Sequence, residues 1–363
     1  MDDEARTTGG LDPWLDRARR SRVRRGRSPY ARTRGLDEPG ATYAALDLGT
    51  NNCRLLVARP AGQGFRVIDA FSRIIRLGEG VSASGRISEA AIERAVSALS
   101  VCRDKMRLRH AGRARLIATE ACRAAENGDE FRARILHEVG LDLEIIDRQT
   151  EASLAATGCT PLIDPETEGV ILFDIGGGSS ELVRLGRCVP ARGGPPLPKI
   201  EGWVSIPVGV VTLAERHGGV TVTRAVFEAM VAEVAGQIAK FAAAHHGDLA
   251  RMHLLGTSGT VTTVAGVYLD LPRYDRRRVD GCWLLDGQVT DVTERLIAMS
   301  YDERIANPCI GAERADLVLA GCAILEAIRR AFPCQRLRVA DRGLREGMLV
   351  EMMRNDGVWD RLS

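Results

Sequence analysis

Hydrophobic and polar positions along the chain follow two patterns, one typical of strands and one typical of helices. The segments YAALDLG and CRLLVARP are short apolar runs separated by a polar turn, and FRVIDAFSRIIRLG continues them. This pattern predicts an antiparallel meander that begins near Ala41 and opens a domain. A helix is expected after Ser88, because apolar residues then recur at helical spacing. These residues are Ile92, Val96, Leu99, Cys102 and Met106.

The alternation of strands and helices continues to the end of the chain. ARLIATEA and LEIID are predicted strands, a helix is predicted from Asp129 to Gly140, and a short helix from Glu151. Further on, WVSIPVG is a predicted strand and long helices are predicted from Thr223 and from about Glu313. RLRVADRGLREGML is predicted to be a strand, a turn and a closing helix. Such alternation predicts an α/β fold.

One part of this pattern occurs twice. ALDLGTNNCRLLV starts at Ala45 and LFDIGGGSSELVR at Leu172, which places Asp47 in register with Asp174 and Gly49 with Gly176. The restart predicts two similar halves with a crevice between them. We expect one domain at 41–152 together with a C-terminal helix at about 346–360, and a second at 153–345.

The two repeated turns have a chemical use in common. Glycine lets the backbone approach a ligand closely, and successive N–H groups in such a turn form an anion-binding concavity. An aspartate at the strand end can face a hydrated Mg²⁺ that bridges carboxylate and phosphate oxygens. The turns therefore predict a pair of phosphate-binding clamps. The loop GTSGT, from Gly256 to Thr260, is a third candidate phosphate contact.

Charge is distributed unevenly along the chain. Residues 1–40 hold ten arginines and seven acidic residues, whereas the remaining chain is close to neutral. Nine of these arginines lie between Arg17 and Arg34 with no acidic residue among them. Such a run repels itself, which favours a disordered tail; weak contact with a polyanion is the alternative function.

Composition narrows the class of protein. No apolar run approaches the ~18 residues of a membrane span, and the N-terminus lacks the apolar core of a signal peptide. The nine cysteines show no CxxC pairing, so we expect reduced, mostly buried thiols rather than a zinc site or a disulfide framework. Both observations favour a cytoplasmic protein.

Several segments together resemble a known family. The two turns resemble the phosphate loops of the actin-like ATPase and sugar-kinase superfamily. Within it, the chain is most similar to the exopolyphosphatase / guanosine pentaphosphate phosphohydrolase family. The segments that carry this resemblance, in the family's order, are ALDLGTNNCRLLV, IATEACRAAEN, LEIIDRQTEA, FDIGGGSSELV, SIPVGVVTLAE, GTSGT, RADLVLAGCAIL and DRGLREGML. The resemblance implies two actin-like (ribonuclease H-like) domains in the short, two-domain form, and a homodimer.

The resemblance also implies roles for individual residues. Glu151 matches the catalytic glutamate, the general base on the attacking water. The implied metal residues, for Mg²⁺ or Mn²⁺, are Asp174, Glu181 and Asp47. The implied phosphate-binding residues are Gly49, Thr50, Asn51, Arg123, Gly176, Gly177, Gly178, Ser179, Gly256, Ser258, Gly259 and Thr260. Taken alone, Glu151 reads as a solvent-facing acid at a helix start. The aspartates read as turn formers.

The chain departs from the family pattern at three places. One acid precedes the alanine in Thr150-Glu151, where the family often has two. Thr212 stands where a basic residue is common, and Asp280 where a histidine is common. The last two changes thin the positive lining of a phosphate channel, and the nearby arginines could compensate. These are Arg273, Arg276, Arg277 and Arg278.

These observations lead to a functional hypothesis with two alternatives. We expect a phosphoanhydride hydrolase that acts on inorganic polyphosphate, on guanosine pentaphosphate (pppGpp), or on both, with water activated by Glu151. The first alternative is a small-molecule kinase of the same superfamily. The second is a non-catalytic sensor that binds (p)ppGpp or polyphosphate.

Overall fold

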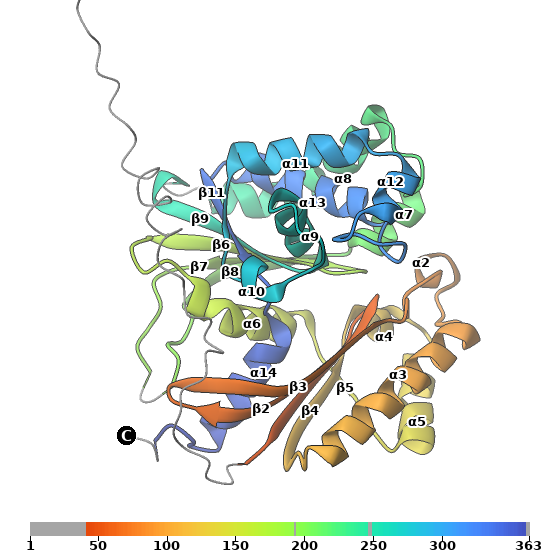
Figure 1. Cartoon of the computed structure of the whole chain (residues 1–363), viewed down its shortest axis with the longest axis vertical. Helices are drawn as coiled ribbons and strands as arrows, with labels where there is room; N and C mark the ends of the chain where they lie inside the picture. Colours follow the sequence, from red (N-terminus) through yellow and green to blue (C-terminus); the bar gives the residue numbers. More distant parts are fainter. Residues whose placement is uncertain (1–40, 192–193, 246–248, 361–363) are drawn as a thin grey trace, which may run out of the picture. The chain divides into compact units, whose positions relative to one another are not determined.

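The computed structural model describes residues 41–191, 194–245 and 249–360, which belong to one compact unit. The arginine-rich segment and the expected N-terminal tail lie outside the described residues. The described residues form two mixed sheets with helices on their faces (Figure 1). The α/β class predicted from the sequence is therefore confirmed.

The first sheet has the strand order β3-β2-β1-β4-β5 in the described part of the chain. Its strands are β1 (Tyr43–Leu48), β2 (Asn52–Ala61), β3 (Gly64–Ile74), β4 (Arg113–Ala118) and β5 (Glu144–Ile145). The associated helices are α2 (Val81–Ser84), α3 (Glu89–Leu108), α4 (Glu120–Ala124), α5 (Gly128–Val139) and α6 (Arg148–Cys159), followed by the 3₁₀ helix η1 (Thr160–Leu162).

The second sheet has the strand order β10-β11-β9-β6-β7-β8. Its strands are β6 (Gly169–Ile175), β7 (Ser180–Leu185), β8 (Ile200–Ile206), β9 (Met252–Thr257), β10 (Trp283–Leu285) and β11 (Arg336–Ala340). The remaining helices are α7 (Val210–His217), α8 (Arg224–Ala244), η2 (Leu249–Arg251), α9 (Gly259–Tyr268), α10 (Arg276–Val279), α11 (Asp286–Ala298), α12 (Tyr301–Ala306), α13 (Val318–Ala331) and α14 (Leu344–Asn355).

The two sheets share one topology, which confirms the expected ribonuclease H-like pair. In the first, β1 pairs antiparallel with β2 and parallel with β4. In the second, β6 pairs antiparallel with β7 and parallel with β9. The order β3-β2-β1-β4-β5 thus matches β8-β7-β6-β9-β11, and β10 is added at the edge.

Both central strands are apolar on both faces, as is typical of strands buried in a sheet with helices on each side. On β1, Leu46 packs in the core with α3 and α5, and Ala45 faces α14. On β6, Phe173 packs with α8, α9 and α13, and Leu172 faces α6. Helices α6 and α14 consequently lie between the two sheets (Figure 1). The proposed domain boundaries remain a prediction.

Several element boundaries differ from those predicted. Helix α6 begins at Arg148 rather than Glu151, because the Asp147 side chain caps it by accepting a hydrogen bond from Thr150 N. Helix α13 begins at Val318 instead of about Glu313. The segment that contains α9, α11 and α12 was not assigned from the sequence. The nine cysteines are free and seven are buried, as predicted.

Candidate active site

The two Asp-Gly turns have the same backbone geometry. In the first turn (residues 47–52), Gly49 N donates to Asn52 O over 2.9 Å. In the second (residues 174–179), Gly176 N donates to Ser179 O over 2.9 Å. The sequence repeat is therefore a structural repeat, with one copy between β1 and β2 and the other between β6 and β7.

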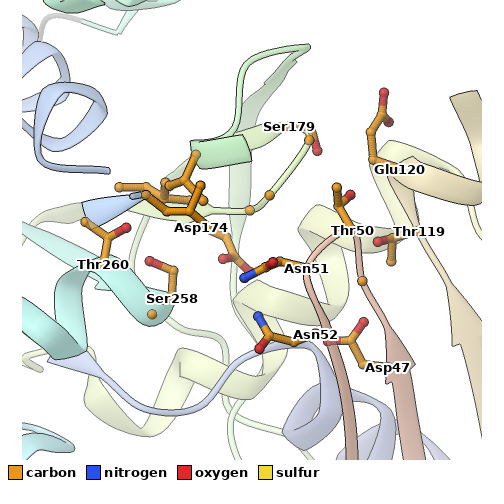
Figure 2. Close-up of a pocket in the computed structure, with 18 of the residues that line it drawn as sticks. Asp47, Thr50, Asn51, Asn52, Thr119, Glu120, Asp174, Ser179, Ser258 and Thr260 are labelled. Carbon is orange, nitrogen blue, oxygen red and sulfur yellow. The ribbon is translucent and has the colours of Figure 1, made fainter. Parts of the chain in front are cut away.

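The two turns meet each other directly. A Cβ added to Gly177 would lie 2.9 Å from Thr50 Cβ, and one added to Gly178 would lie 2.9 Å from Thr50 Oγ1. Glycine is required in the second turn because any side chain would collide with the first. Around this contact lies a cavity of about 130 Å³, which we call the inner cavity. Figure 2 shows residues from both turns facing it.

Most of the residues predicted for the site line the inner cavity. They are Asp47, Gly49, Thr50, Asn51, Glu151, Asp174, Gly176, Gly177, Gly178, Ser179, Glu181, Ser258, Gly259 and Thr260. Gly256 does not line it: this glycine lies within β9, where an added Cβ would be 2.6 Å from Phe173 Cζ. Arg123 also lies outside the lining.

Cross-strand pairing explains how the two turns differ. Asp47 lies opposite Arg54 on β2, whereas Asp174 lies opposite Glu181 on β7. The first turn thus presents a mixed pair and the second a pair of acids. Glu181 is buried, and its Oε1 accepts hydrogen bonds from Ser179 Oγ at 2.7 Å and from Ser205 Oγ at 2.8 Å.

The pKa values of Asp174 and Glu181 are both raised. Burial, and then repulsion by Asp47, raises the pKa of Asp174 to about 6. Burial, and then repulsion by Asp174, raises the pKa of Glu181 to about 7. Clustered perturbed carboxylates of this kind are typical of functional sites.

Glu151 projects into the inner cavity from the first turn of α6. Burial, and then the charge of Glu181, holds its pKa well above the usual range, while Arg123 lowers it. Its Oε2 accepts a hydrogen bond from Arg123 Nη2 at 3.2 Å. Its Oε1 has no hydrogen-bond partner among the described residues, so this oxygen is open to a ligand or to water.

Arg123 belongs to a compact ionic cluster. Besides Glu151, it donates to Glu120 Oε2 from Nε at 3.0 Å and to Ile146 O from Nη1 at 2.6 Å. Glu120 also accepts from Arg148 Nη2 at 2.8 Å. The resemblance implies contact of Arg123 with a polyanion, which remains a prediction.

Sequence reasoning missed six polar residues of the inner cavity, which are Asn52, Arg54, Thr119, Glu120, Thr263 and Arg314. Thr119 precedes α4 and Glu120 begins it, Asn52 begins β2, and Arg314 precedes α13. Glu120 stands in the quoted segment IATEACRAAEN, so an acid at a strand end was the available signal. Arg314 opens the segment RADLVLAGCAIL, which carries part of the family resemblance, but no role was predicted for it.

The loop GTSGT holds its middle residue in a strained conformation. Ser258 has φ +127°, which is unusual for a residue with a side chain, and such strain is concentrated at functional sites. Its buried Oγ has no hydrogen-bond partner in the part of the chain that the structure describes. The buried Oδ1 atoms of Asn51 and Asn52 also lack one. In Figure 2, the Asn51 and Asn52 side chains project between Asp47 and Ser258.

The donor set around the inner cavity fits a hydrated divalent cation. Asp47 and Asp174 accept no hydrogen bond from the described residues, and burial raises the pKa of Asp47. Among the described residues, no three acidic, cysteine or histidine side chains are close enough to enclose a metal by themselves. Mg²⁺ does not require such a cage, because it usually keeps several waters and binds one or two carboxylates together with substrate phosphates.

The residues that depart from the family pattern have local partners. Thr212 Oγ1 accepts a hydrogen bond from Gly209 N at 2.9 Å, at the start of α7. Asp280 forms a buried ion pair with Arg342. Arg276, one of the four arginines that could compensate, donates to Glu346 Oε1 at 2.8 Å.

No helix in the described ranges is long and apolar enough to cross a bilayer.

Comparison with known proteins gives one consistent family. A model described as the Ppx/GppA phosphatase family matches residues 56–356. Exopolyphosphatase 2 of Mycobacterium tuberculosis is 28% identical over 327 residues, which cover 85% of this chain and 98% of that protein. The guanosine-5'-triphosphate,3'-diphosphate pyrophosphatase of Aeromonas hydrophila is 28% identical over 315 residues, which cover 86% of this chain and 60% of that protein.

A solved structure agrees with these relatives. The crystal structure of the Aquifex aeolicus member of the Ppx/GppA family is similar with a TM-score of 0.70 and 27% identity, covering 87% of this chain and 98% of that one. Since the family model spans most of the chain, including the second Asp-Gly turn and α14, the chain belongs to the Ppx/GppA phosphatase family.

Proposed function

We propose that this protein is a phosphoanhydride hydrolase that releases the terminal phosphate of inorganic polyphosphate, the 5'-γ-phosphate of pppGpp, or both. One observation carries the proposal: two Asp-Gly turns and five carboxylates converge on one cavity between the sheets. The names of the relatives, an exopolyphosphatase and a guanosine-5'-triphosphate,3'-diphosphate pyrophosphatase, support this class of reaction.

In this proposal, the terminal phosphate lies between the two turns. Backbone N–H groups of residues 50–51 and 177–179 contact its oxygens, and the Ser258 and Thr260 side chains close one side. Phosphoryl transfer depends mainly on positioning and on stabilising the charge of a loose transition state. Preorganised N–H groups supply both without reorganisation during the reaction.

Glu151 orients the attacking water and takes its proton. The water oxygen bonds to the terminal phosphorus as the bridging P–O bond breaks, and the bridging electron pair stays with the leaving phosphate. The proton goes to Glu151 Oε1, the oxygen that Arg123 does not occupy. Burial and the neighbouring acids raise the pKa of Glu151, which strengthens its carboxylate as a base.

Asp174, Glu181 and Asp47 would hold Mg²⁺ or Mn²⁺ through carboxylate oxygens and water. When bound, the cation neutralises developing charge on the phosphate oxygens. Two of the three carboxylates, Asp174 and Glu181, belong to the second turn and its strand, and Asp47 belongs to the first turn. A homodimer and a contact between the 17–34 arginine run and polyanions are further predictions from the sequence.

The direct test is phosphate release from polyphosphate and from pppGpp, measured in parallel with and without Mg²⁺. We expect release from at least one substrate, and its loss when the cation is chelated. Consumption of ATP that depends on an added small-molecule acceptor, with neither substrate hydrolysed, would support the kinase alternative. Tight binding of pppGpp or polyphosphate without phosphate release would support the sensor alternative.

A further inference from the structure

One segment that carries the family resemblance, SIPVGVVTLAE, contains none of the residues proposed for the reaction. It ends β8 and continues into α7, which begins directly on the second Asp-Gly turn. Val210 N donates to Gly176 O over 2.9 Å, and the next amide, Val211 N, donates to the next carbonyl of the turn over 2.9 Å. A Cβ added to Gly209 would lie 2.3 Å from Gly177 O. Helix α7 is therefore fixed tightly to the second turn.

The segment that follows β3 is fixed in the same way to the first turn. Ile75 N donates to Asn51 O over 2.9 Å. Gly78 N donates to Thr50 O over 2.9 Å, and a Cβ added to Gly78 would lie 2.3 Å from Thr50 Cγ2. This segment continues into α2, and we call residues 75–82 the arm of the first turn.

Glu215, on α7, joins this arm to the second turn. Its Oε1 accepts a hydrogen bond from Gly80 N at 2.9 Å, and its Oε2 accepts one from Ser82 Oγ. Both carboxylate oxygens thus bind the arm, although Glu215 belongs to the helices of the second sheet. Because the arm is fixed to the first turn and α7 to the second, this one carboxylate connects the two turns.

A cavity of about 250 Å³ lies behind this connection. Its walls include Asn51 of the first turn, Glu215, and the ion pair of Arg76 with Asp316. Side-chain packing therefore does not fill the space between the arm and α7, and polar contacts hold them together there. Hydrogen bonds that are exposed to solvent open more easily than a packed core. The separation of the two turns on this side consequently depends on these contacts.

Glu215 lies outside the lining of the inner cavity, so it acts on the site through other residues. A phosphate between the turns meets donors from both only when their separation fits it, and preorganised donors lose much of their effect when they are displaced by ~1 Å. We propose that Glu215 is a positioning residue that holds the two turns at the separation that fits a terminal phosphate. This inference rests on the proposed hydrolase function.

Loss of this connection should change KM more than kcat. Without it, only a fraction of the molecules holds the turns at the fitting separation, and the apparent affinity for substrate falls by that fraction. Bound phosphate contacts both turns and restores the separation, so the saturated enzyme keeps its rate. An exposed acid without this role would change neither constant, and an acid that takes part in the chemical step would lower kcat.

The test compares the full wild-type chain with three variants. Glu215→Ala removes both hydrogen bonds, whereas Glu215→Gln keeps a carbonyl oxygen for Gly80 N. Glu233→Ala is the matched control, because Glu233 also binds two side chains of α7 but belongs to α8 of the same sheet. Hydrogen exchange of the arm is followed by mass spectrometry, KM and kcat are measured on the hydrolysed substrate, and thermal melting verifies folding.

We expect Glu215→Ala to speed amide exchange in the arm and to raise KM about 3- to 10-fold, the effect of losing a hydrogen bond to an exposed charged group. Its kcat should change less than about twofold, because substrate restores the separation. Glu215→Gln should recover part of the loss. Glu233→Ala should match the wild type in exchange and in KM.

Three results would overturn the inference. Unchanged exchange in Glu215→Ala would show that Glu215 does not hold the arm. Faster exchange with unchanged KM would show that the arm does not set the separation of the turns. A lower kcat at unchanged KM would assign Glu215 to the chemical step.

Failure of the hydrolase proposal would look different. The wild-type protein would then release no phosphate from polyphosphate or from pppGpp, whatever residue stands at position 215. In that case the dissociation constant of polyphosphate replaces KM in the same comparison, so the role of Glu215 is still decided.

Discussion

The guanidinium of Arg123 is bound to Glu151, at 3.2 Å from Oε2, and at the same time to Glu120. The side chains of Arg123 and Glu151 are each less than a fifth exposed. The geometry therefore makes Arg123 a neighbour of the candidate base, and its contacts with protein oxygens occupy Nε, Nη1 and Nη2. Arg123 could bind substrate or orient Glu151, and these two roles predict different effects on KM and kcat.

Arg123→Gln should lower kcat while KM for polyphosphate changes little. The substitution removes the donor that holds Glu151 Oε2, so the carboxylate loses its fixed orientation toward water. Steady-state kinetics on the variant distinguishes the two roles. A rise in KM at constant kcat would instead indicate that Arg123 contacts the polyanion.

Glu151→Gln should abolish most turnover and leave polyphosphate binding intact. A general base typically contributes ~10²–10⁴-fold to the rate, and glutamine cannot accept the proton. Phosphate release and equilibrium binding are measured on the same preparation, with the exposed Glu138→Gln as control. Wild-type turnover in the Glu151 variant would refute its catalytic role.

Arg76 and Asp316 connect the two sheets beside the inner cavity. Arg76 Nη1 and Nη2 donate to the Asp316 carboxylate at 3.0 and 3.1 Å, and Arg76 N donates to Asn51 O in the first turn at 3.1 Å. The ion pair thus links the first turn to the second sheet's side of the cleft. Its contribution should be modest, because both side chains are partly exposed.

Arg76→Gln and Asp316→Asn should each weaken polyphosphate binding, and the double variant should be no weaker than the weaker single one. Residues in contact show such non-additivity, and a partly exposed pair is worth up to ~1 kcal/mol. A double-mutant cycle on binding measures the coupling. Fully additive losses would show that the pair does not act as a unit.

Acid should destabilise the protein through His253. This buried residue donates from Nδ1 to Leu254 O at 2.9 Å and accepts from Asp164 N at Nε2 over 3.3 Å. Burial lowers its pKa to about 4, so the unfolded chain, with an ordinary histidine, binds the proton more readily. The stabilisation is complete above about pH 6.5 and is lost progressively as pH falls toward 4.

At the acidic end of this pH range the free energy of unfolding should fall by about 3 kcal/mol, because the pKa of His253 is about 4 in the folded protein and 6.5 in an ordinary histidine. Chemical denaturation at several pH values measures it. His253→Gln should start less stable but lose less between pH 6.5 and 4, which separates this residue from acidic groups that also titrate there. An equal acid loss in both proteins would contradict the assignment.

The sequence by itself determined the repeated turn and much of its setting. The register of Asp47 with Asp174 predicted two equivalent strand connections, and both were found with the same hydrogen bond. Patterns of period two and 3.6 are local consequences of burial, so they predicted β1 and the start of α8 nearly correctly. The resemblance to the Ppx/GppA family was also recognised from short local segments of the sequence.

The tertiary structure decided how charged groups are paired and where space remains. Nothing local shows that Arg342 is buried against Asp280. Asp280 lies 62 residues before Arg342 in the chain, and ion pairing depends on distance in space. The contact between Arg123 and Glu151 depends on the tertiary structure in the same way, and so does the convergence of Asp47 and Asp174 on the inner cavity.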